Sequence, residues 1–363
     1  MTDRSATLAR AAALRARFQG EGAEVVETPI LQPAGALLDL YGEDIRGRAY
    51  VTADALRGEQ MLRPDFTVPV VQMHMARGGS PARYTYSGEV FRRQEQDEDR
   101  ANEYIQVGYE IFGGDDPAAA DAEVFALIAE ALSEFGLRAA TGDMGLLLAA
   151  VRGLKTTERR KAALLRHVWR PRRFRSLLDR FSGRVPMTPA RKALLAAEDP
   201  LAGAGPEIGC RSRAEVLDRI AALRADAEAP PIPGHVIEAL DELLSVRETA
   251  PFALEHLRDV AVDLPAIQPA LDRMAARIEA LAARGVDVER LDFEASYGRT
   301  SMEYYDGFVF GFYAETRPDL PPIATGGRYD ALTRQLGQGR AIPAVGGVLR
   351  PGLMQQLAGE GAP

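Results

Sequence analysis

Cysteine is nearly absent from this sequence. Cys210 is the single cysteine among 363 residues, so the chain can form no internal disulfide and no cysteine-based metal cluster. Histidine is also scarce, and the four histidines do not show the spacing of metal ligands: His74, His167, His235 and His256. We therefore expect no metal site and no bound cofactor, and a reducing, cytoplasmic setting.

Long hydrophobic segments are absent as well. No stretch has the length and apolarity of a membrane span, and the charges spread through residues 1–18 are unlike a signal peptide. The net charge of −8 argues against nonspecific nucleic-acid binding by the whole surface, although it does not exclude a local basic patch. The length of 363 residues fits one large or two modest domains, and the hydrophobic content of 46% is enough for a sizeable core.

The glycine-rich phosphate loops of nucleotide-binding folds are missing. No G-x-G-x-x-G follows a predicted strand and no P-loop occurs, which disfavours a doubly wound fold. Strand patterns occur toward both ends of the chain with helical patterns between them, which predicts an α+β fold with an antiparallel sheet flanked by helices. We assign residues 1–150 and 286–363 to this core and residues 151–285 to a mainly helical insertion.

Periodicity and turn residues predict the individual elements. The expected elements are helices over residues 5–20 and 117–137, a helix beginning near Thr67, and strands over residues 22–31, 286–295 and 303–315. Because proline is confined to strand edges and bulges, Pro29 indicates an edge strand or an interface. The glycine-rich segment from residue 324 is expected to be a loop.

Residues 83–114 show the most informative pattern, two alternating runs on either side of an acidic tip. Gln106, Gly108 and Glu110 share one face of the second run, and the residues between them are hydrophobic. We predict a hairpin that packs its hydrophobic face on the core and offers its polar face to a ligand. The alternative is that Gln106 and Glu110 decorate a solvated sheet face.

Four segments, the hairpin among them, together resemble the class II aminoacyl-tRNA synthetases, and specifically the histidyl-tRNA synthetases. The other matching segments are TPILQP (28–33), LRPDFT (62–67), and the pair EYYDGFVFGFY (303–313) and TGGRYD (325–330). They occur in the family's order, and the match covers about residues 1–135 and 290–353. The resemblance implies the class II catalytic-domain fold, with the helical insertion in the expected place.

The resemblance also implies a histidine-binding site. The matching positions are Asp65 and Thr67 for the α-ammonium group, Gln106 and Glu110 for the amino acid, and Tyr304 and Tyr305 beside the imidazole. These residue types suit the ligand, because an ammonium group needs acceptors and an imidazole needs an acceptor and a hydroxyl partner. Gly108 and Gly307 are expected to leave room for the ligand on this face.

The arginines that the resemblance requires around ATP are mostly missing. Arg92 occupies the conserved hairpin position and is a candidate for a residual phosphate site. The histidine-specific arginine is replaced by Thr300, and the last arginine of the pattern by Leu353. Arg299 and Arg350 lie nearby but out of register, and a one-residue slip along a strand turns a side chain to the opposite face.

The chain ends at Pro363, shortly after these segments, so we expect no anticodon-binding domain. A synthetase-like fold with the amino-acid site, but without the ATP arginines and the tRNA-reading domain, resembles the ATP phosphoribosyltransferase regulatory subunits of histidine biosynthesis. That resemblance implies a non-catalytic chain, required for the activity of a short-form catalytic subunit and for its feedback inhibition by L-histidine. It implies a dimer with Pro29 at its interface, within a hetero-octamer.

Three other functions remain open. The chain could form histidyl-adenylate and act on a target other than tRNA, it could bind tRNA, or it could sense histidine for another partner. The basic run from Leu154 to Arg184 is the only support for tRNA, and we interpret it instead as a helical face with Trp169 in the local core. We therefore consider tRNA an improbable partner.

Overall fold

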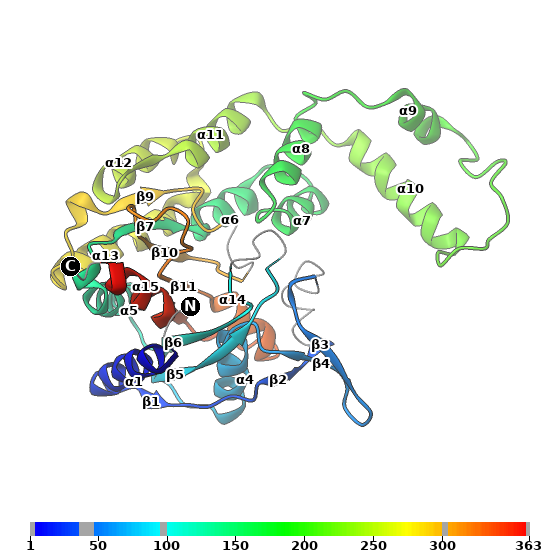
Figure 1. The fold of residues 1–363 in the computed structure, drawn as a ribbon. Helices are drawn as coiled ribbons and strands as arrows, with labels where there is room; N and C mark the ends of the chain where they lie inside the picture. Colours follow the sequence, from blue (N-terminus) through cyan, green and yellow to red (C-terminus); the bar gives the residue numbers. More distant parts are fainter. Residues whose placement is uncertain (1–3, 36–46, 95–99, 300–303, 361–363) are drawn as a thin grey trace.

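A mixed sheet of nine strands forms the centre of the molecule (Figure 1). A computed structural model describes residues 4–35, 47–94, 100–299 and 304–360. In spatial order the strands are β1 (Glu24–Val25), β5 (Ala82–Phe91), β6 (Glu103–Phe112), β12 (Ala344–Leu349), β11 (Ala324–Arg328), β10 (Phe308–Tyr313), β7 (Arg138–Asp143), β9 (Asp292–Glu294) and β8 (Arg247–Thr249). The pairs β1–β5 and β7–β9 are parallel, and the other pairs are antiparallel. The predicted α+β fold is confirmed.

Helices cover one face of this sheet. They are α1 (Arg4–Gly20), α5 (Pro117–Ala131), α13 (Gln268–Ala283) and α15 (Pro351–Glu360). The alternation predicted for β10 supplies part of this interface, since Phe308, Phe310 and Phe312 all contact the ring of Phe125 on α5. Burying such rings is a large source of stability, because each removes an extensive apolar surface from water.

The opposite face carries smaller elements. They are α4 (Thr67–Arg77), α14 (Asp330–Leu336) and a three-stranded sheet of β2 (Leu31–Pro33), β4 (Gly58–Leu62) and β3 (Val51–Asp54). Helices α4 and α14 pack against each other. The segment before α4 crosses this face, so it brings the predicted Asp65 and Thr67 toward the hairpin of β5 and β6.

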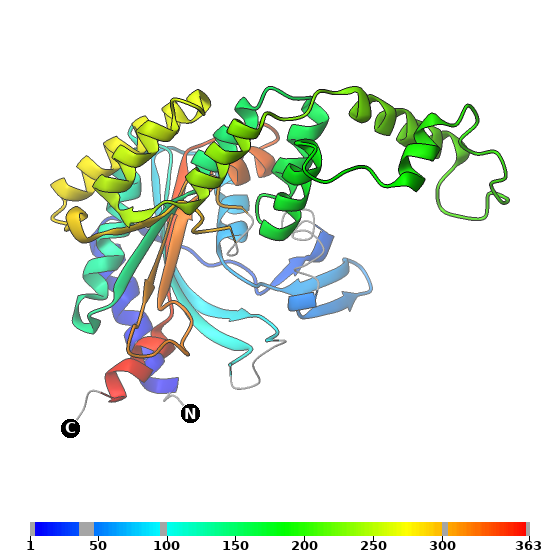
Figure 2. The ribbon, with the colours of Figure 1, turned by 90° about the horizontal axis from the view of Figure 1, so that it is seen from above.

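The segment between β7 and β9 is mainly helical. It contains α6 (Met144–Gly153), α7 (Glu158–Arg166), α8 (Pro171–Phe181), α9 (Pro189–Ala196), α10 (Arg213–Glu228), α11 (Gly234–Ser245), α12 (Ala250–Val260) and α13. Helices α9 and α10 project from the rest of the molecule as an arm (Figure 2). Strand β8 and helix α13 belong to this segment, yet one joins the central sheet and the other packs on α5. The division into a core and an insertion stays a prediction.

The basic run lies on α7 and α8, and part of its charge is neutralised within the protein. Arg160 is buried and donates to Asp226 over 2.7 Å, and Arg175 forms an ion pair with Asp179 at 3.2 Å. Trp169 is half-buried and packs against the hydrophobic core. The prediction that Trp169 belongs to the local core is therefore confirmed.

Four charged side chains form a buried cluster between the sheet and its covering helices. Arg328 of β11 donates to Asp121 of α5 over 2.7 Å, and Arg277 of α13 donates to Asp143 of β7 over 2.8 Å. Arg277 also reaches Asp121 at 3.4 Å. A pair of charges tolerates such burial only when hydrogen bonds hold both partners, as they do here.

Several element boundaries differ from the sequence prediction. Residues 22–31 do not form one strand, because β1 and β2 are short and Pro29 lies exposed between them. The expected loop from residue 324 is strand β11, at the centre of the sheet. Glycines usually indicate a turn, but here they serve close packing. A Cβ on Gly326 would lie only 2.3 Å from the Phe310 ring. Glycine is needed there for close approach, and the segment is not a turn.

Candidate functional site

Glu110 lies at the centre of a cluster of polar side chains on the sheet face opposite α5. It is carried by β6, is 1% exposed and accepts hydrogen bonds from three hydroxyl groups. Thr67 donates over 3.0 Å and Tyr86 over 2.6 Å, and Tyr329 donates as well. Because the carboxylate is held by donors from α4, β5 and the end of β11, its position is fixed by three separate elements.

Burial changes the acid–base properties of this cluster. Loss of water, with a smaller contribution from the nearby Asp65 carboxylate, raises the pKa of Glu110 to about 7, even though the three hydroxyl donors lower it. Burial also raises the pKa values of Tyr86 and Tyr329 well above their usual range, so both stay protonated donors at neutral pH. Two carboxylates that repel each other in a buried site favour a positively charged ligand between them.

Glycines allow this arrangement by leaving out side chains from the same sheet face. A Cβ on Gly108 would lie 2.1 Å from the Tyr86 ring, so the ring crosses β6 there to reach Glu110. The expectation that Gly108 leaves room for a ligand was therefore wrong, because Tyr86 fills the space. Gly307 likewise makes room for protein, since a Cβ there would lie 3.0 Å from the Arg328 side chain.

Gln106 lies two positions before Gly108 on the same face of β6. It is 1% exposed, and neither of its amide atoms has a hydrogen-bond partner among the described residues. An unpaired buried amide costs free energy, which a ligand with complementary groups would recover. The solvated-face alternative for Gln106 and Glu110 was wrong, because β6 is covered on both faces.

Tyr304 and Tyr305 close the cluster from the β10 side. Their rings are in edge contact with centroids 4.8 Å apart, and Tyr304 also meets the Tyr329 ring at 6.1 Å. Both tyrosines are buried, and burial raises both pKa values. A Cβ on Gly327 would lie 2.8 Å from the Tyr305 ring, so this glycine lets Tyr305 lie against the sheet.

Asp65 and Thr67 complete the predicted histidine site. Both are buried, and the Asp65 carboxylate accepts from the backbone N–H of Val68 at the start of α4 over 3.3 Å. Thr67 joins the cluster directly through Glu110. Five side chains of the predicted site are therefore linked by hydrogen bonds, ring contacts or electrostatic interactions: Asp65, Thr67, Glu110, Tyr304 and Tyr305. Gln106 shares the face of β6 that carries Glu110 but has no such link to a described residue.

The arginines of this region have separate partners. Arg92 donates to the carbonyl of Pro64 over 2.7 Å, just before the segment that carries Asp65. Arg299 instead donates to the carbonyl of Val168 over 2.9 Å and lies over the Phe174 ring, so it belongs to the helical segment. Thr300 lies outside the described residues, and Leu353 packs against the core.

Tyr86 and Tyr329 are the contributors that the sequence analysis missed. Tyr86 is the cross-strand partner of Gly108, so pairing the two runs of the hairpin in register would have placed it on the polar face. Tyr329 lies in the segment TGGRYD, which the resemblance had singled out without a role for its tyrosine. Its contact with Glu110 joins residues far apart in sequence and depends on the tertiary fold.

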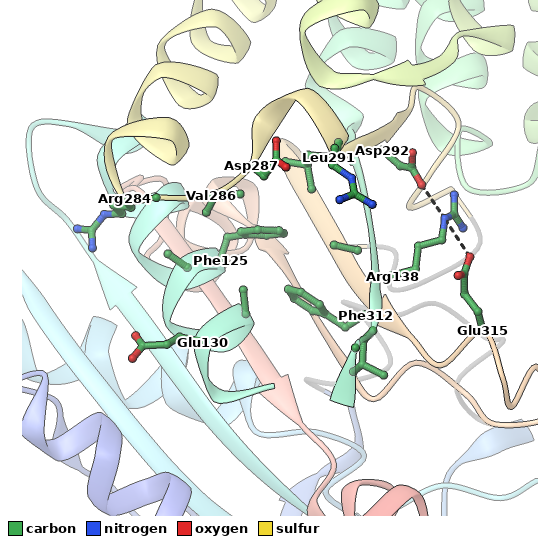
Figure 3. Close-up of a pocket in the computed structure, with 17 residues that line it drawn as sticks. Phe125, Glu130, Arg138, Arg284, Val286, Asp287, Leu291, Asp292, Phe312 and Glu315 are labelled. Atoms are coloured by element: carbon green, nitrogen blue, oxygen red, sulfur yellow. Dashed lines mark hydrogen bonds and ion pairs between the residues drawn. The ribbon is translucent and has the colours of Figure 1, made fainter. Parts of the chain in front are cut away.

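A separate cavity of about 810 Å³ lies away from this cluster, against α5 and the ends of β7 and β10 (Figure 3). Phe125 and Phe312 contribute to its apolar lining, and Arg138 pairs with Asp292 over 2.6 Å at its rim. Arg138 also lies 3.9 Å from Glu315, so this part of the rim is neutralised within the protein.

Two further features are absent from the described parts of the chain. No helix there combines the length and apolarity that crossing a bilayer requires. Within the same residues, no group of three or more histidine, cysteine, aspartate or glutamate side chains is arranged to hold a metal ion.

Comparison with known proteins gives the family. The histidyl-tRNA synthetase family model matches residues 3–201 and 213–351. A protein of Brucella anthropi named ATP phosphoribosyltransferase regulatory subunit is 33% identical over 371 residues, which is 96% of each chain. This chain belongs to the ATP phosphoribosyltransferase regulatory subunits. A regulatory, non-catalytic role goes with that membership.

Other relatives agree on name and fold. A Brucella ovis regulatory subunit of the same name is 32% identical, again over 96% of each chain. A Bacillus halodurans structure, titled ATP phosphoribosyltransferase regulatory subunit/histidyl-tRNA synthetase, gives a TM-score of 0.67 at 21% identity, covering 97% of this chain and 79% of that one. A Nostoc histidyl-tRNA synthetase gives 0.64 at 16% identity, covering 99% and 73%. At these identities the structures support the fold alone.

Proposed function

We propose that this chain binds L-histidine at the Glu110 cluster and regulates the activity of an ATP phosphoribosyltransferase catalytic subunit. The observation that carries the histidine proposal is Gln106, a buried amide without a partner among the described residues, on the same face of β6 as the buried Glu110 carboxylate. Buried polar groups without a hydrogen-bond partner are expected where a ligand supplies the missing hydrogen bonds.

The chemistry of the cluster fits the two ends of histidine. The Glu110 carboxylate can accept from an imidazole N–H, and a tyrosine hydroxyl can bond the other ring nitrogen. Asp65 and Thr67 supply acceptors for the α-ammonium group, which also relieves the repulsion between the Asp65 and Glu110 carboxylates. Gln106 can donate to the ligand and accept from it at once.

Regulation follows by linkage between histidine and the partner. If histidine binds one conformation of the complex more tightly, it shifts the population toward that conformation and thereby inhibits the catalytic subunit. The coupling required is typically ~1–3 kcal/mol, which the cluster's charged contacts could supply. The partner in this proposal is the short form of the catalytic subunit, which depends on this chain for activity.

The proposal extends to assembly and location. Pro29 is exposed between β1 and β2, as a residue at a dimer interface would be in one isolated chain, and we propose that the dimer takes part in a hetero-octamer. The single cysteine, Cys210, is exposed and unpaired, which suits a reducing cytoplasm.

Reconstitution tests the proposal. The chain would be mixed with the short-form catalytic subunit of the same organism, and phosphoribosyl-ATP formation measured with and without L-histidine. We expect the chain to raise the rate and histidine to lower it again. A rate that responds neither to the chain nor to histidine would contradict the proposal.

Formation of histidyl-adenylate is the second candidate, favoured by the presence of Arg92 beside the cluster. An adenylating enzyme would catalyse histidine-dependent exchange of pyrophosphate into ATP. We expect no such exchange by the purified chain, because most of the arginines that the reaction would need are absent. Exchange at a rate well above background would favour this candidate instead.

A further inference from the structure

We propose that Arg350 forms a carboxylate-binding site at the far end of the Glu110 cluster and fixes the direction in which an amino acid lies there. The inference rests on the proposed function, since it deepens the histidine site. No residue of the predicted site supplied a cation for the ligand's α-carboxylate.

Strand pairing places Arg350 on the ligand face. In the ladder between β12 and β6, Gly346 pairs with Glu110 and Val348 with Gly108. One further step of two residues puts Arg350 level with Gln106, and residues two apart share a face of a strand. Gly346 identifies this face as the one that carries Glu110, because a Cβ on Gly346 would lie 2.8 Å from the Glu110 side chain.

The Arg350 side chain is held among neutral groups. Its guanidinium donates to the carbonyl of Pro322 over 2.6 Å and to the hydroxyl of Thr325 over 3.2 Å, and it hydrogen-bonds Tyr104. Among the described residues it forms no ion pair with a carboxylate. A partly buried guanidinium without a counter-ion is costly, so an anionic ligand group would be strongly favoured beside it.

Neighbouring charges point to the same conclusion. Burial lowers the pKa of Arg350, and the guanidinium of Arg92 lowers it further, so two cations lie close together at this end of the cluster. The charge of Arg350 in turn lowers the pKa of Tyr305, so Arg350 lies near a residue of the proposed site. The cluster is thus negative at the Glu110 end and positive at the Arg350 end.

This polarity matches one amino acid lying along β6. Gln106 and Glu110 are four residues apart, which separates their Cα atoms by about 13 Å along a strand. The side chains of Glu110 and Arg350 are long and share this face of the sheet, so a ligand needs to span only part of that interval. The imidazole then lies at Glu110 and the α-carboxylate at Arg350, with Gln106 between them.

Calorimetric titration of the full chain with L-histidine and with histamine, which lacks the carboxylate, tests the inference. In Arg350→Gln we expect histidine affinity to fall roughly 10- to 100-fold, as for loss of a charge-assisted hydrogen bond, with histamine affinity unchanged. Arg350→Lys keeps the charge and is expected to lie between the two. Arg258→Gln, the same change at an arginine exposed on α12, serves as the matched control and should bind both ligands normally.

The outcomes separate this inference from the function on which it rests. If the unsubstituted chain binds histidine and Arg350→Gln binds it equally well, the carboxylate site is wrong while the histidine site stands. An equal loss of histidine and histamine binding also overturns the inference, since Arg350 would then support the fold and not the carboxylate. If the unsubstituted chain binds neither ligand, the proposed function itself fails.

Discussion

A single buried carboxylate organises the candidate site at the scale of residues. Glu110 accepts hydrogen bonds from the hydroxyl groups of Thr67, Tyr86 and Tyr329, which lower its pKa. The pKa nevertheless rises to about 7. Loss of water therefore outweighs three hydrogen bonds. The cluster thus holds a carboxyl group whose pKa is near neutral, which suits a ligand that brings donors and positive charge.

The raised pKa of Glu110 predicts a pH dependence of stability. The folded value is about 7 and the ordinary value 4.5, so the folded chain holds this proton more tightly than the unfolded chain. Stability from this group is fully present below pH 4.5 and is lost as pH rises through 7, by roughly 3 kcal/mol in total. The measurement is the free energy of unfolding in urea, for the wild type and for Glu110→Gln, from pH 5 to pH 8. As pH rises, we expect the wild type to lose stability relative to the variant. A difference between the two that does not vary with pH would contradict the prediction.

Glu110→Gln should also weaken histidine binding. The substitution keeps the shape but replaces a charged acceptor with a neutral amide, so we expect roughly a 10- to 100-fold loss of affinity in calorimetry. Glu134→Gln, at an exposed glutamate in the turn after α5, is the matched control and should bind as the wild type does. Unchanged affinity in Glu110→Gln would mean that histidine binds elsewhere.

Sequence reasoning identified the acidic residues, Thr67 and the tyrosine pair of the site, but not the hydroxyl donors Tyr86 and Tyr329. Asp65, Glu110 and Tyr305 could be matched by motif, because each lies in a short recognisable segment. The contact from Tyr329 to Glu110 spans 219 positions, and no local pattern encodes it. The roles of the glycines were misjudged for the same reason, since the ring that fills the space at Gly108 comes from the neighbouring strand.

At the scale of elements, the buried charge cluster joins α5, α13, β7 and β11. Asp121 is the shared acceptor of Arg277 and Arg328. Its removal leaves two buried guanidinium groups with fewer negative charges to balance them. Asp121→Ala should lower the free energy of unfolding by about 3–5 kcal/mol. The measurement is urea denaturation at neutral pH.

The control for Asp121→Ala is an exposed ion pair. Glu255→Ala removes the partner of Arg258 on the surface of α12, where a loss of at most about 1 kcal/mol is expected. Similar losses for the two variants would show that the buried cluster contributes no more than a surface pair does.

The elements themselves were predicted best where the periodicity is long. Helix α1 and the hairpin of β5 and β6 appear as expected, because repeated burial on one face leaves a clear pattern. Strand β11 was missed, since its glycines serve close packing in the middle of the sheet and resemble a turn in sequence. The shortness of β1 and β2 was also missed, because their pairing depends on distant strands.

At the scale of the whole molecule, the arm of α9 and α10 has little core of its own. Helix α9 has no buried residue in its described length, and the buried residue of α10 is Ile220. The loop between the two helices is largely exposed. The arm is therefore expected to open locally far more easily than the sheet, whose strands are covered on both faces.

Limited digestion with trypsin tests this difference. Arg211 lies in the exposed loop just before α10, so we expect the first cut there, with the two fragments staying associated. Arg160 supports that association, because it donates to Asp226 and to the carbonyl of Pro230 at the base of the arm. Mass spectrometry identifies the cut, and an earlier cut within the central sheet would contradict the prediction.

The contact between α1 and α15 has a consequence for circular permutation of the chain. Gln355 of α15 donates to the carbonyl of Ala6 on α1 over 3.1 Å, so the first and the last helix lie side by side (Figure 2). A flexible linker could join the start of α1 to the end of α15, and new ends could be opened at the tip of the arm. Such a circular permutant would keep every strand pairing of the central sheet while changing the order in which the strands are synthesised.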